Sequence, residues 1–467
     1  MSLSRRTFLA GAATGFTTLV LAACTPSRPT PSPSTTSPIL PPSPVPAPLA
    51  VVRSDWAADE FARGSHSFIA AHSSPADRAT LREPLQARLY FAGEATSDEL
   101  PASVDGAAAS GIRAAAEVLA DAADGERIAV IGAGAAGAAS AARLRDYGFQ
   151  VTVIEARDRT GGRIATREDE AWPVPIELGA GWAPDSGSAV SLRLASLGIG
   201  TSAVDGDPLL RTPDGVDAGG SNVGADAIDS AVGWAAGRPD DGTLTESLEG
   251  SGAGDLDAGG EPPTALERLD AELLEQVGIA RGADADAISS WYGFAEPAAP
   301  QAERVTGGYG RYIDDQLEGI DVWLSTPVTA VSYGDNRVSI RLGTGESVSV
   351  DRVVLTVPLG VLKGQGITFE PALPFARRAA IADLGFGATD TVWVHFDEAF
   401  WETDAVRWSL LGGDAAITEW LNLEPLTGEA VLVGLVDEDR SAALAELDET
   451  ALAAAVSASL EPFAPLP

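Results

Sequence analysis

Three glycines and a glutamate have the types and the spacing of a dinucleotide-binding turn. Gly132, Gly134 and Gly137 form the pattern GxGxxG, and Glu155 ends the next apolar stretch, "QVTVIE". The first glycine permits a tight turn, the second lets the backbone approach a pyrophosphate, and the third lets a helix pack close to a sheet. Glu155 can accept hydrogen bonds from a ribose. A βαβ unit that binds no ligand would contain the same glycines.

Small and basic residues follow this turn. The stretch "ARDRTGGRIAT" begins at Ala156 and contains Arg157, Gly162 and Arg163. Glycine again permits a close approach of the backbone, and arginine can meet phosphate charge. This extension is not typical of nicotinamide-dependent dehydrogenases. A small-residue turn comes next, in "ELGAGW", and contains Gly179, Ala180, Gly181 and Trp182.

Lys363 is the single lysine among 31 basic residues. It follows the apolar run "VVLTVPLGVL", which is expected to be buried. Lysine is a compact donor whose pKa can fall on burial, whereas arginine is larger, planar and permanently charged. Because arginine serves everywhere else, the single lysine indicates a role that arginine cannot fill. A solvated surface lysine is the alternative.

The elements around these residues predict an α/β fold. An apolar strand at 127–131, an alanine-rich helix to about 147 and a second strand ending at Glu155 surround the glycines, which is the context that a dinucleotide site requires. Residues 185–300 are rich in Asp and Gly, and 264–279 form their clearest amphipathic helix. Strand-like segments then alternate with turns, and an alanine-rich helix is expected over about 443–460.

Composition excludes several classes of protein. The formal net charge of −36 argues against nucleic acid binding. Such acidity favours solubility, and it would also attract a cationic small substrate. Three scattered histidines, His66, His72 and His395, do not have metal-site spacing, and we expect no metal. The single cysteine excludes a disulfide within the chain and a cysteine-rich metal site.

The first residues resemble an export signal. Arg5 and Arg6 precede an apolar run of small residues that ends at Cys24, as in a twin-arginine signal followed by a lipobox. We therefore expect a lipid on Cys24, which would anchor the protein to the outer face of the bacterial cytoplasmic membrane. An uncleaved membrane anchor is the alternative, although the run is short for a span. Ten prolines among Ser and Thr in 25–48 predict an extended linker.

Taken together, the motifs resemble the flavin-containing amine oxidase family, which includes monoamine oxidases, polyamine oxidases and lysine-specific histone demethylases. The resemblance rests on the glycine turn, ARxRxGGR, LGAxW, GGYG at 307–310 and "VVLTVPLGVLKGQGITFEPALP" at 353–374. Two closing segments of the family, here "WAADEFARGSHS" at 56–67 and "YFAGEAT" at 90–96, come first in this chain. We therefore predict a circular permutation, with a truncated tandem duplication as the alternative.

The resemblance implies a Rossmann-like FAD-binding domain interleaved with a mixed-sheet and helical substrate domain. The expected division is a signal at 1–24, a linker at 25–49, the FAD-binding domain at 50–184 (the family's C-terminal part at 50–124, then its N-terminal part at 125–184) and again at 302–370, and a substrate domain with a helical part at 185–301 and a sheet part at 371–467.

It also implies roles for particular residues. FAD would be bound without a covalent bond, because Ser65 stands where covalent members of the family have cysteine. Glu94 would bind its ribityl or pyrophosphate side, and Val328 would contact adenine. The helix beginning near Ser103 would point at the flavin. The remaining cofactor contacts implied are Trp56, Gly93 and Val104.

The implied reaction is removal of hydride from the carbon next to an amine, with O2 reduced to H2O2 and the imine hydrolysed. Lys363 would hold a water against the flavin, and His66 and Ser103 would flank the substrate where monoamine oxidases have two tyrosines. The sequence does not choose among monoamines, polyamines and amino acids. A flavoprotein acting on C–C bonds and an inactive flavin-binding surface protein are the alternatives.

Overall fold

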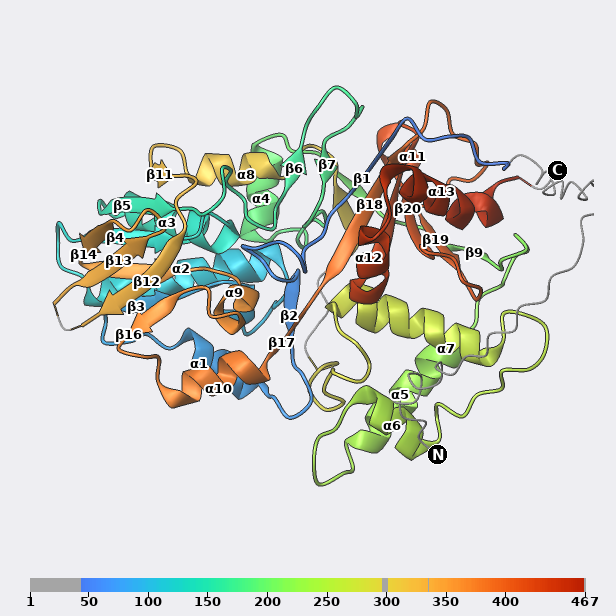
Figure 1. Ribbon diagram of the computed structural model, residues 1–467, viewed down its shortest axis with the longest axis horizontal. Helices are drawn as coiled ribbons and strands as arrows, with labels where there is room; N and C mark the ends of the chain where they lie inside the picture. The colour runs from blue at the N-terminus through green and yellow to red at the C-terminus, as the bar shows by residue number, and fades with distance from the viewer. Residues whose placement is uncertain (1–42, 296–300, 335, 466–467) are drawn as a thin grey trace, which may run out of the picture. The chain divides into compact units, whose positions relative to one another are not determined.

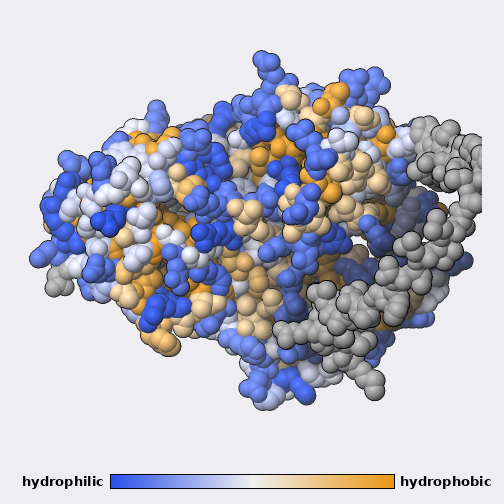
Figure 2. Space-filling model, in the orientation of Figure 1, coloured by the Kyte–Doolittle hydropathy of each residue, from blue (hydrophilic) through white to orange (hydrophobic). Residues whose placement is uncertain are grey.

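The computed structural model describes residues 43–295, 301–334 and 336–465 (Figure 1). The predicted signal, Cys24 and most of the linker lie outside the described residues. Within the described part, no helix has both the length and the apolar character that crossing a bilayer requires. Hydrophilic side chains cover much of the face shown in Figure 2, with smaller apolar patches between them.

A parallel five-stranded sheet carries the glycine turn and confirms the α/β class. Its strands are short and nearly free of charge except at their ends, as befits a sheet covered on both faces. Their order across the sheet is β11 (Asp321–Trp323), β5 (Gln150–Ile154), β4 (Arg127–Ile131), β15 (Arg352–Leu355) and β3 (Leu89–Phe91).

Two small-residue helices pack tightly beside this sheet. Helix α2 (Val104–Asp121) lies against α3 (Ala135–Asp146), and both are rich in alanine and glycine. A Cβ on Gly111 would lie only 2.1 Å from the carbonyl oxygen of Ala136. The two backbones can therefore approach each other this closely only because side chains are small.

A second, mostly antiparallel sheet lies on the other side of the described fold (Figure 1). Its central tryptophans Trp393, Trp408 and Trp420 are fully buried and dominate its packing. The order across this sheet is β1 (Ala50–Arg53), β18 (Thr389–His395), β21 (Val431–Asp437), β20 (Glu419–Asn422), β19 (Arg407–Leu410) and β9 (Leu209–Arg211).

The last helical region differs from its prediction. Residues 443–460 were expected to form one helix, but the structure has α12 (Glu438–Ala445) and α13 (Glu449–Leu460). Asp448 starts the second helix, because its carboxylate accepts a hydrogen bond from the backbone N–H of Ala451 at 2.9 Å. The predicted helix at 264–279 is present as α7 (Ala265–Leu273), continued by the π-helical η2 (Leu274–Ile279).

The remaining elements connect or cover these sheets. A four-stranded sheet has the order β14 (Ser347–Val350), β13 (Val338–Leu342), β12 (Val328–Tyr333) and β16 (Thr368–Glu370). Strand pairs are β10 (Glu303–Val305) with β8 (Thr201–Ala203), β17 (Gly385–Gly387) with β2 (His66–Phe68), and β6 (Thr166–Arg167) with β7 (Ile176–Glu177). The other helices are α1 (Pro75–Arg82), η1 (Glu94–Thr96), α4 (Ala189–Ser196), α5 (Val223–Ala235), α6 (Leu244–Ser251), α8 (Gly310–Gln316), α9 (Leu359–Lys363), α10 (Phe375–Asp383), α11 (Glu424–Thr427) and η3 (Glu461–Phe463).

Candidate functional site

A cavity of about 520 Å³ connects the two main sheets. Ile131 and Ile154, at the ends of β4 and β5, line it on one side, and Thr391 and Leu435, from β18 and β21, line it on the other. Pockets of this volume hold small molecules and cofactors. The predicted residues that line it are Trp56, His66, Gly93, Glu94, Ser103, Val104, Gly132, Gly134, Glu155, Ala156, Arg157, Gly162, Arg163, Gly179, Ala180, Gly181, Trp182 and Val328.

The glycine turn has the geometry that an anion requires. Gly132 has a φ of 106°, which favours glycine, and Gly134 stands at the N-cap of α3 without a side-chain cap. The first backbone N–H groups of α3 are therefore open to a ligand. Gly137 does not line the cavity. A Cβ there would lie 1.9 Å from the carbonyl oxygen of Gly132, so its role is to let the helix pack on the turn.

Glu155 and Arg157 are held by neighbours in this part of the site. The Glu155 carboxylate accepts hydrogen bonds from the backbone N–H groups of Ala133 at 2.7 Å and Arg157 at 2.9 Å. The Arg157 guanidinium makes two hydrogen bonds with Asp59, at 2.7 and 2.8 Å. Arg157 was predicted to meet phosphate charge. The structure pairs it with a carboxylate from the segment at 56–67 and also places it in the cavity lining, so a phosphate contact stays a prediction.

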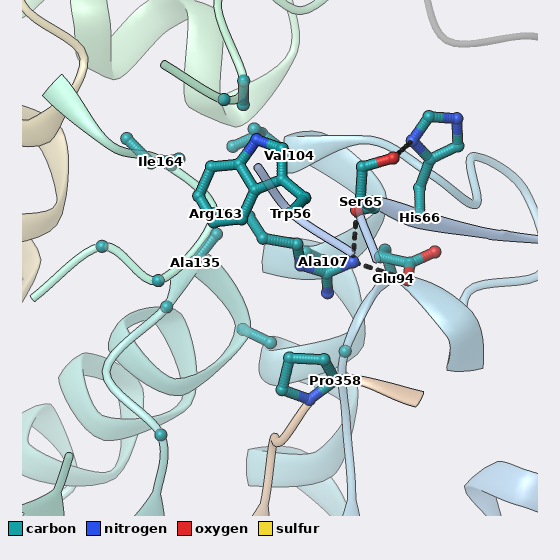
Figure 3. Close-up of a pocket in the computed structure, with 18 of the residues that line it drawn as sticks. Trp56, Ser65, His66, Glu94, Val104, Ala107, Ala135, Arg163, Ile164 and Pro358 are labelled. Atoms are coloured by element: carbon teal, nitrogen blue, oxygen red, sulfur yellow. Dashed lines mark hydrogen bonds and ion pairs between the residues drawn. The ribbon is translucent and has the colours of Figure 1, made fainter. Parts of the chain in front are cut away.

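Arg163 and Glu94, which both line the cavity, form a largely buried ion pair with a nitrogen and an oxygen 3.1 Å apart (Figure 3). The same guanidinium donates to the carbonyl oxygen of Ser65 at 2.6 Å, and Glu94 accepts from the Ser67 hydroxyl at 2.7 Å. Burial acts to raise the pKa of Glu94, but the guanidiniums of Arg163 and Arg78 and the Ser67 hydrogen bond bring it below its ordinary value. Glu94 is therefore an anion at neutral pH.

His66 lies beyond Ser65, and its ring faces away from Arg163 in Figure 3. Its Nδ1 is 2.9 Å from the Ser65 hydroxyl, while Nε2 is buried and has no hydrogen-bond partner in the described part of the chain. Burial lowers the pKa of His66 to about 4, so the ring is neutral at neutral pH. A neutral ring cannot repel a cationic substrate.

Ser103 has a structural role that the sequence comparison with the family did not indicate. It is the N-cap of α2, and its hydroxyl accepts from the Gly106 N–H at 2.9 Å and donates to the Leu100 carbonyl at 2.7 Å. Ser103 lines the cavity, but its hydrogen-bonding capacity is largely used by the cap. It therefore fixes the start of the helix that reaches the cavity at Val104.

The structure does not bring Lys363 to the cavity. Its ammonium donates to the carbonyl oxygens of Ile381 at 3.0 Å and Ala382 at 2.7 Å, near the end of α10. The partial burial that the sequence predicted is present, and it lowers the pKa of Lys363. However, Lys363 is buried because it caps the end of α10, where two carbonyl oxygens accept hydrogen bonds from its ammonium.

Among the cavity residues that the sequence analysis missed, two carry polar side chains on the substrate side. Arg304 in β10 and Gln301 just before it both line the cavity. The guanidinium of Arg304 lies over the Trp182 ring, 5.0 Å from its centroid. No local pattern marked Arg304, since an arginine beside GGYG is unremarkable in a chain so rich in arginine. Its position depends on the pairing of β10 with residues far away.

Comparisons with known proteins agree with this geometry. The family model described as flavin containing amine oxidoreductase matches residues 36–119 and 255–466, which is more than half of the chain. A model for an NAD(P)-binding Rossmann-like domain matches 130–195. Together these matches include both sides of the cavity.

Individual relatives match part of their own length. Polyamine oxidase 4 of Oryza sativa subsp. japonica is 30% identical over 338 residues, covering 66% of this chain and 66% of that protein. Lysine-specific histone demethylase 1 homolog 3 of Arabidopsis thaliana is 28% identical over 389 residues, covering 67% and 23%. The chain thus spans less than two thirds of these curated relatives.

Solved structures share the fold. Cyclohexylamine oxidase from Brevibacterium oxydans IH-35A superposes with a TM-score of 0.59 at 21% identity, covering 73% of this chain and 82% of that one. A putrescine oxidase bound to putrescine gives a TM-score of 0.57 at 20% identity, with the same coverage. At these identities the likeness establishes the architecture.

Proposed function

Because the chain belongs to the flavin-containing amine oxidoreductase family, we propose that it is an FAD-dependent amine oxidase. One observation carries this proposal. A single cavity extends from the glycine turn at Gly132 and Gly134 to Trp182 and to Leu435 of the second sheet. A dinucleotide cofactor and a substrate can therefore share one continuous space, as hydride transfer requires.

The residues present fit FAD. The open N–H groups at the start of α3 suit a pyrophosphate, and Glu155 at the end of β5 suits a ribose. Gly162 and Gly134 approach each other without side chains, so that a ligand can lie against backbone. We infer that FAD is bound without a covalent bond, because the only cysteine is Cys24 in the predicted signal.

When bound, FAD would accept a hydride from the carbon next to the amine and reduce O2 to H2O2, leaving an imine that water hydrolyses. The protein binds the cofactor and the substrate and orients them toward each other. Ser103 fixes the start of α2, whose first N–H groups and dipole face the cavity at Val104 and can stabilise negative charge. Apolar lining residues such as Ile279 and Leu435 exclude water.

Purified protein tests this proposal directly. It should be yellow, and acid precipitation should release all the chromophore into the supernatant. A panel of monoamines, diamines, polyamines and amino acids should include at least one that yields H2O2 in proportion to the amine consumed. A flavoprotein acting on C–C bonds would give no amine-dependent peroxide, and an inactive flavin scaffold would bind amines without turnover. Flavin that stays on the pellet would contradict non-covalent binding.

We also propose that the chain is a circular permutation of the family order. In support, β3 pairs with β15 in the five-stranded sheet, and α2 packs on α3, so the segment before the glycine turn completes the same sheet. Val45 shares a hydrophobic cluster with Phe463 and Ala464, near the end of the described chain. The two ends that permutation would separate therefore belong to one packed region (Figure 1).

Rearranged chains test the permutation. A chain that begins at residue 125, continues to 465 and then joins to 43–124 restores the family order. We expect it to bind FAD and to unfold within a few degrees of the original. If the front segment came from a lost duplicate, residues 125–465 alone would fold and bind FAD. The same experiment tests the predicted division of the FAD-binding domain at residue 125.

Export and lipidation of Cys24 are proposed from the sequence of the first 24 residues. Mass spectrometry of the mature protein should find a lipid on Cys24 as the first residue. Cys24→Ala should release the protein from the membrane fraction. Recovery of an unmodified protein that begins at Met1 would contradict this proposal.

A further inference from the structure

An arginine with no anionic partner lies in the cavity wall. Arg304 is 2% exposed, and its Nη2 is buried without a hydrogen-bond partner among the described residues. The guanidinium lies over the rings of Trp182 and Trp393, at 5.0 and 5.9 Å from their centroids. Stacking on aromatic rings satisfies its faces and leaves its in-plane donors unused.

The chain makes room for this guanidinium. A Cβ on Gly181 would lie 2.5 Å from both Nη1 and Nη2 of Arg304, so any other residue there would displace it. Glu177 is the carboxylate whose charge raises the pKa of Arg304, and each of its oxygens already accepts one hydrogen bond from another group. They accept from the Tyr309 N–H and the Thr166 hydroxyl, each at 2.7 Å. Glu177 forms no ion pair with Arg304 in the described structure.

The charge of Arg304 persists at neutral pH. Burial lowers its pKa to about 10, which keeps it protonated. A buried and uncompensated charge is costly, and residues that hold one commonly pair it with a ligand. The energetic gain from an incoming anion is therefore large at this position.

The carboxylates that line the cavity all come from the first third of the chain. Glu60, Glu94, Asp105 and Glu155 all precede residue 156, whereas the described lining residues from Gly179 onward include a single charged one, Arg304. The wall near Trp182, Gln301 and Leu435 therefore offers a cation and no anion. A second ammonium group of a diamine would be repelled there, while a carboxylate could receive two parallel N–H donors.

We propose that Arg304 binds a carboxylate of the substrate, so that the preferred substrate is an amine that also carries a carboxylate, such as an amino acid. This inference deepens the proposed function and rests on it for turnover. The binding of the carboxylate itself does not depend on turnover. An experiment can therefore contradict carboxylate binding by Arg304 without contradicting the amine oxidase activity, and the reverse.

Binding is measured first, on the FAD-loaded protein. We expect 4-methylpentanoate, which cannot be oxidised as an amine, to bind with a change in tryptophan fluorescence, and Arg304→Met to weaken it at least tenfold. Arg304→Lys should weaken it less, since charge is kept and the planar pair of donors is lost. Arg238→Met is the matched control, because it removes an arginine that stacks on Trp234, which does not line the cavity.

Turnover is then compared within pairs of amines that differ only in whether they carry a carboxylate. L-leucine is paired with 3-methylbutylamine and 4-aminobutanoate with propylamine, and putrescine serves as the dication. In the wild type, kcat/KM should favour at least one carboxylate-bearing member by tenfold, and Arg304→Met should abolish that preference. If putrescine is the better substrate and ligand, or if Arg304→Met affects both members equally, the proposal is overturned. If carboxylates bind through Arg304 but no amine is oxidised, the inference stands and the amine oxidase assignment fails.

Discussion

The two sides of the cavity treat charge differently. On the cofactor side, built from the five-stranded sheet and the loops around it, Arg157 pairs with Asp59 and Arg163 pairs with Glu94. On the substrate side, built from the six-stranded sheet, β10 and η2, Arg304 has a buried nitrogen without a partner among the described residues. Glu419 of β20, which does not line the cavity, is a buried carboxyl whose only described hydrogen bond is with Ser409. The first side pairs its charged groups with one another, whereas the second holds a charged arginine and a carboxyl that burial keeps protonated at neutral pH.

This difference follows from the ligands. A dinucleotide can be bound largely by backbone N–H groups and a helix end, so the side chains around it need only hold the framework. Substrate choice requires side chains that discriminate, and a polar group left unpaired until the ligand arrives discriminates strongly. Unpaired buried groups reduce stability, which the paired cofactor side can offset.

The largest effect is expected where the cofactor side has no spare volume. Gly137→Ala would place a Cβ 1.9 Å from the carbonyl oxygen of Gly132, against backbone that cannot move alone. We expect a loss of about 3 kcal/mol in the free energy of unfolding and at least a hundredfold weaker binding of FAD, measured by urea unfolding and by flavin fluorescence.

Gly233→Ala is the control for that substitution. Gly233 lies in the exposed face of α5, and its Cβ would meet nothing within 4 Å. The change should stabilise by roughly 0.5–1 kcal/mol, as alanine does in a helix. Equal effects at the two sites would show that the α3 turn is not tightly packed.

Removing one member of the buried ion pair comes next. Glu94→Gln leaves the Arg163 charge without its carboxylate and should cost about 3 kcal/mol at pH 7. Since the pKa of Glu94 is below its ordinary 4.5, the wild-type advantage is complete above pH 4.5 and is lost as the pH falls through the folded-state pKa. Urea titrations at pH 7 and at low pH measure both. Asp146→Asn, in the more exposed Arg145 pair, should change stability by less than about 1 kcal/mol.

On the substrate side, the pH dependence of stability has the opposite sign. Burial raises the pKa of Glu419 to about 8, above the ordinary 4.5. The folded protein therefore binds the extra proton, and stability falls as the pH rises from 4.5 through about 8. Glu419→Gln should be the more stable protein at pH 9, by about 1–2 kcal/mol, and should lose this advantage at pH 4. Glu446→Gln, an exposed control, should track the wild type at both values.

The smallest effect is expected at Lys363. Because its ammonium caps α10 and does not line the cavity, Lys363→Met should change flavin reoxidation by O2 less than twofold and should lower the unfolding free energy by about 1 kcal/mol. Stopped-flow measurement of flavin reoxidation distinguishes this capping role from a catalytic one. A tenfold slowing would restore the catalytic role that the sequence predicted.

The contrast also explains what the sequence could predict. The strand, turn, helix and strand from 127 to 155 were placed within one residue, because GxGxxG and its flanking apolar runs are local. The resemblance supplied most of the other predicted residues that line the cavity. Arg304 was missed because its environment is made by Gly181 and Trp393, which are distant in sequence, and Lys363 was misplaced because burial alone does not say which group buries it.

The order of the strands has a consequence for how the chain acquires its fold during synthesis. The Ser54 hydroxyl donates a hydrogen bond to Asp390, 336 residues later in the chain, and β3 likewise pairs with β15, which is made much later. At about 5–20 residues per second, Ser54 leaves the ribosome roughly 20 to 70 s before Asp390 is made, and β3 leaves it roughly 10 to 50 s before β15 is made. Pairing across such separations is slow, and the leading segment stays exposed to misassociation until the last hundred residues have been made.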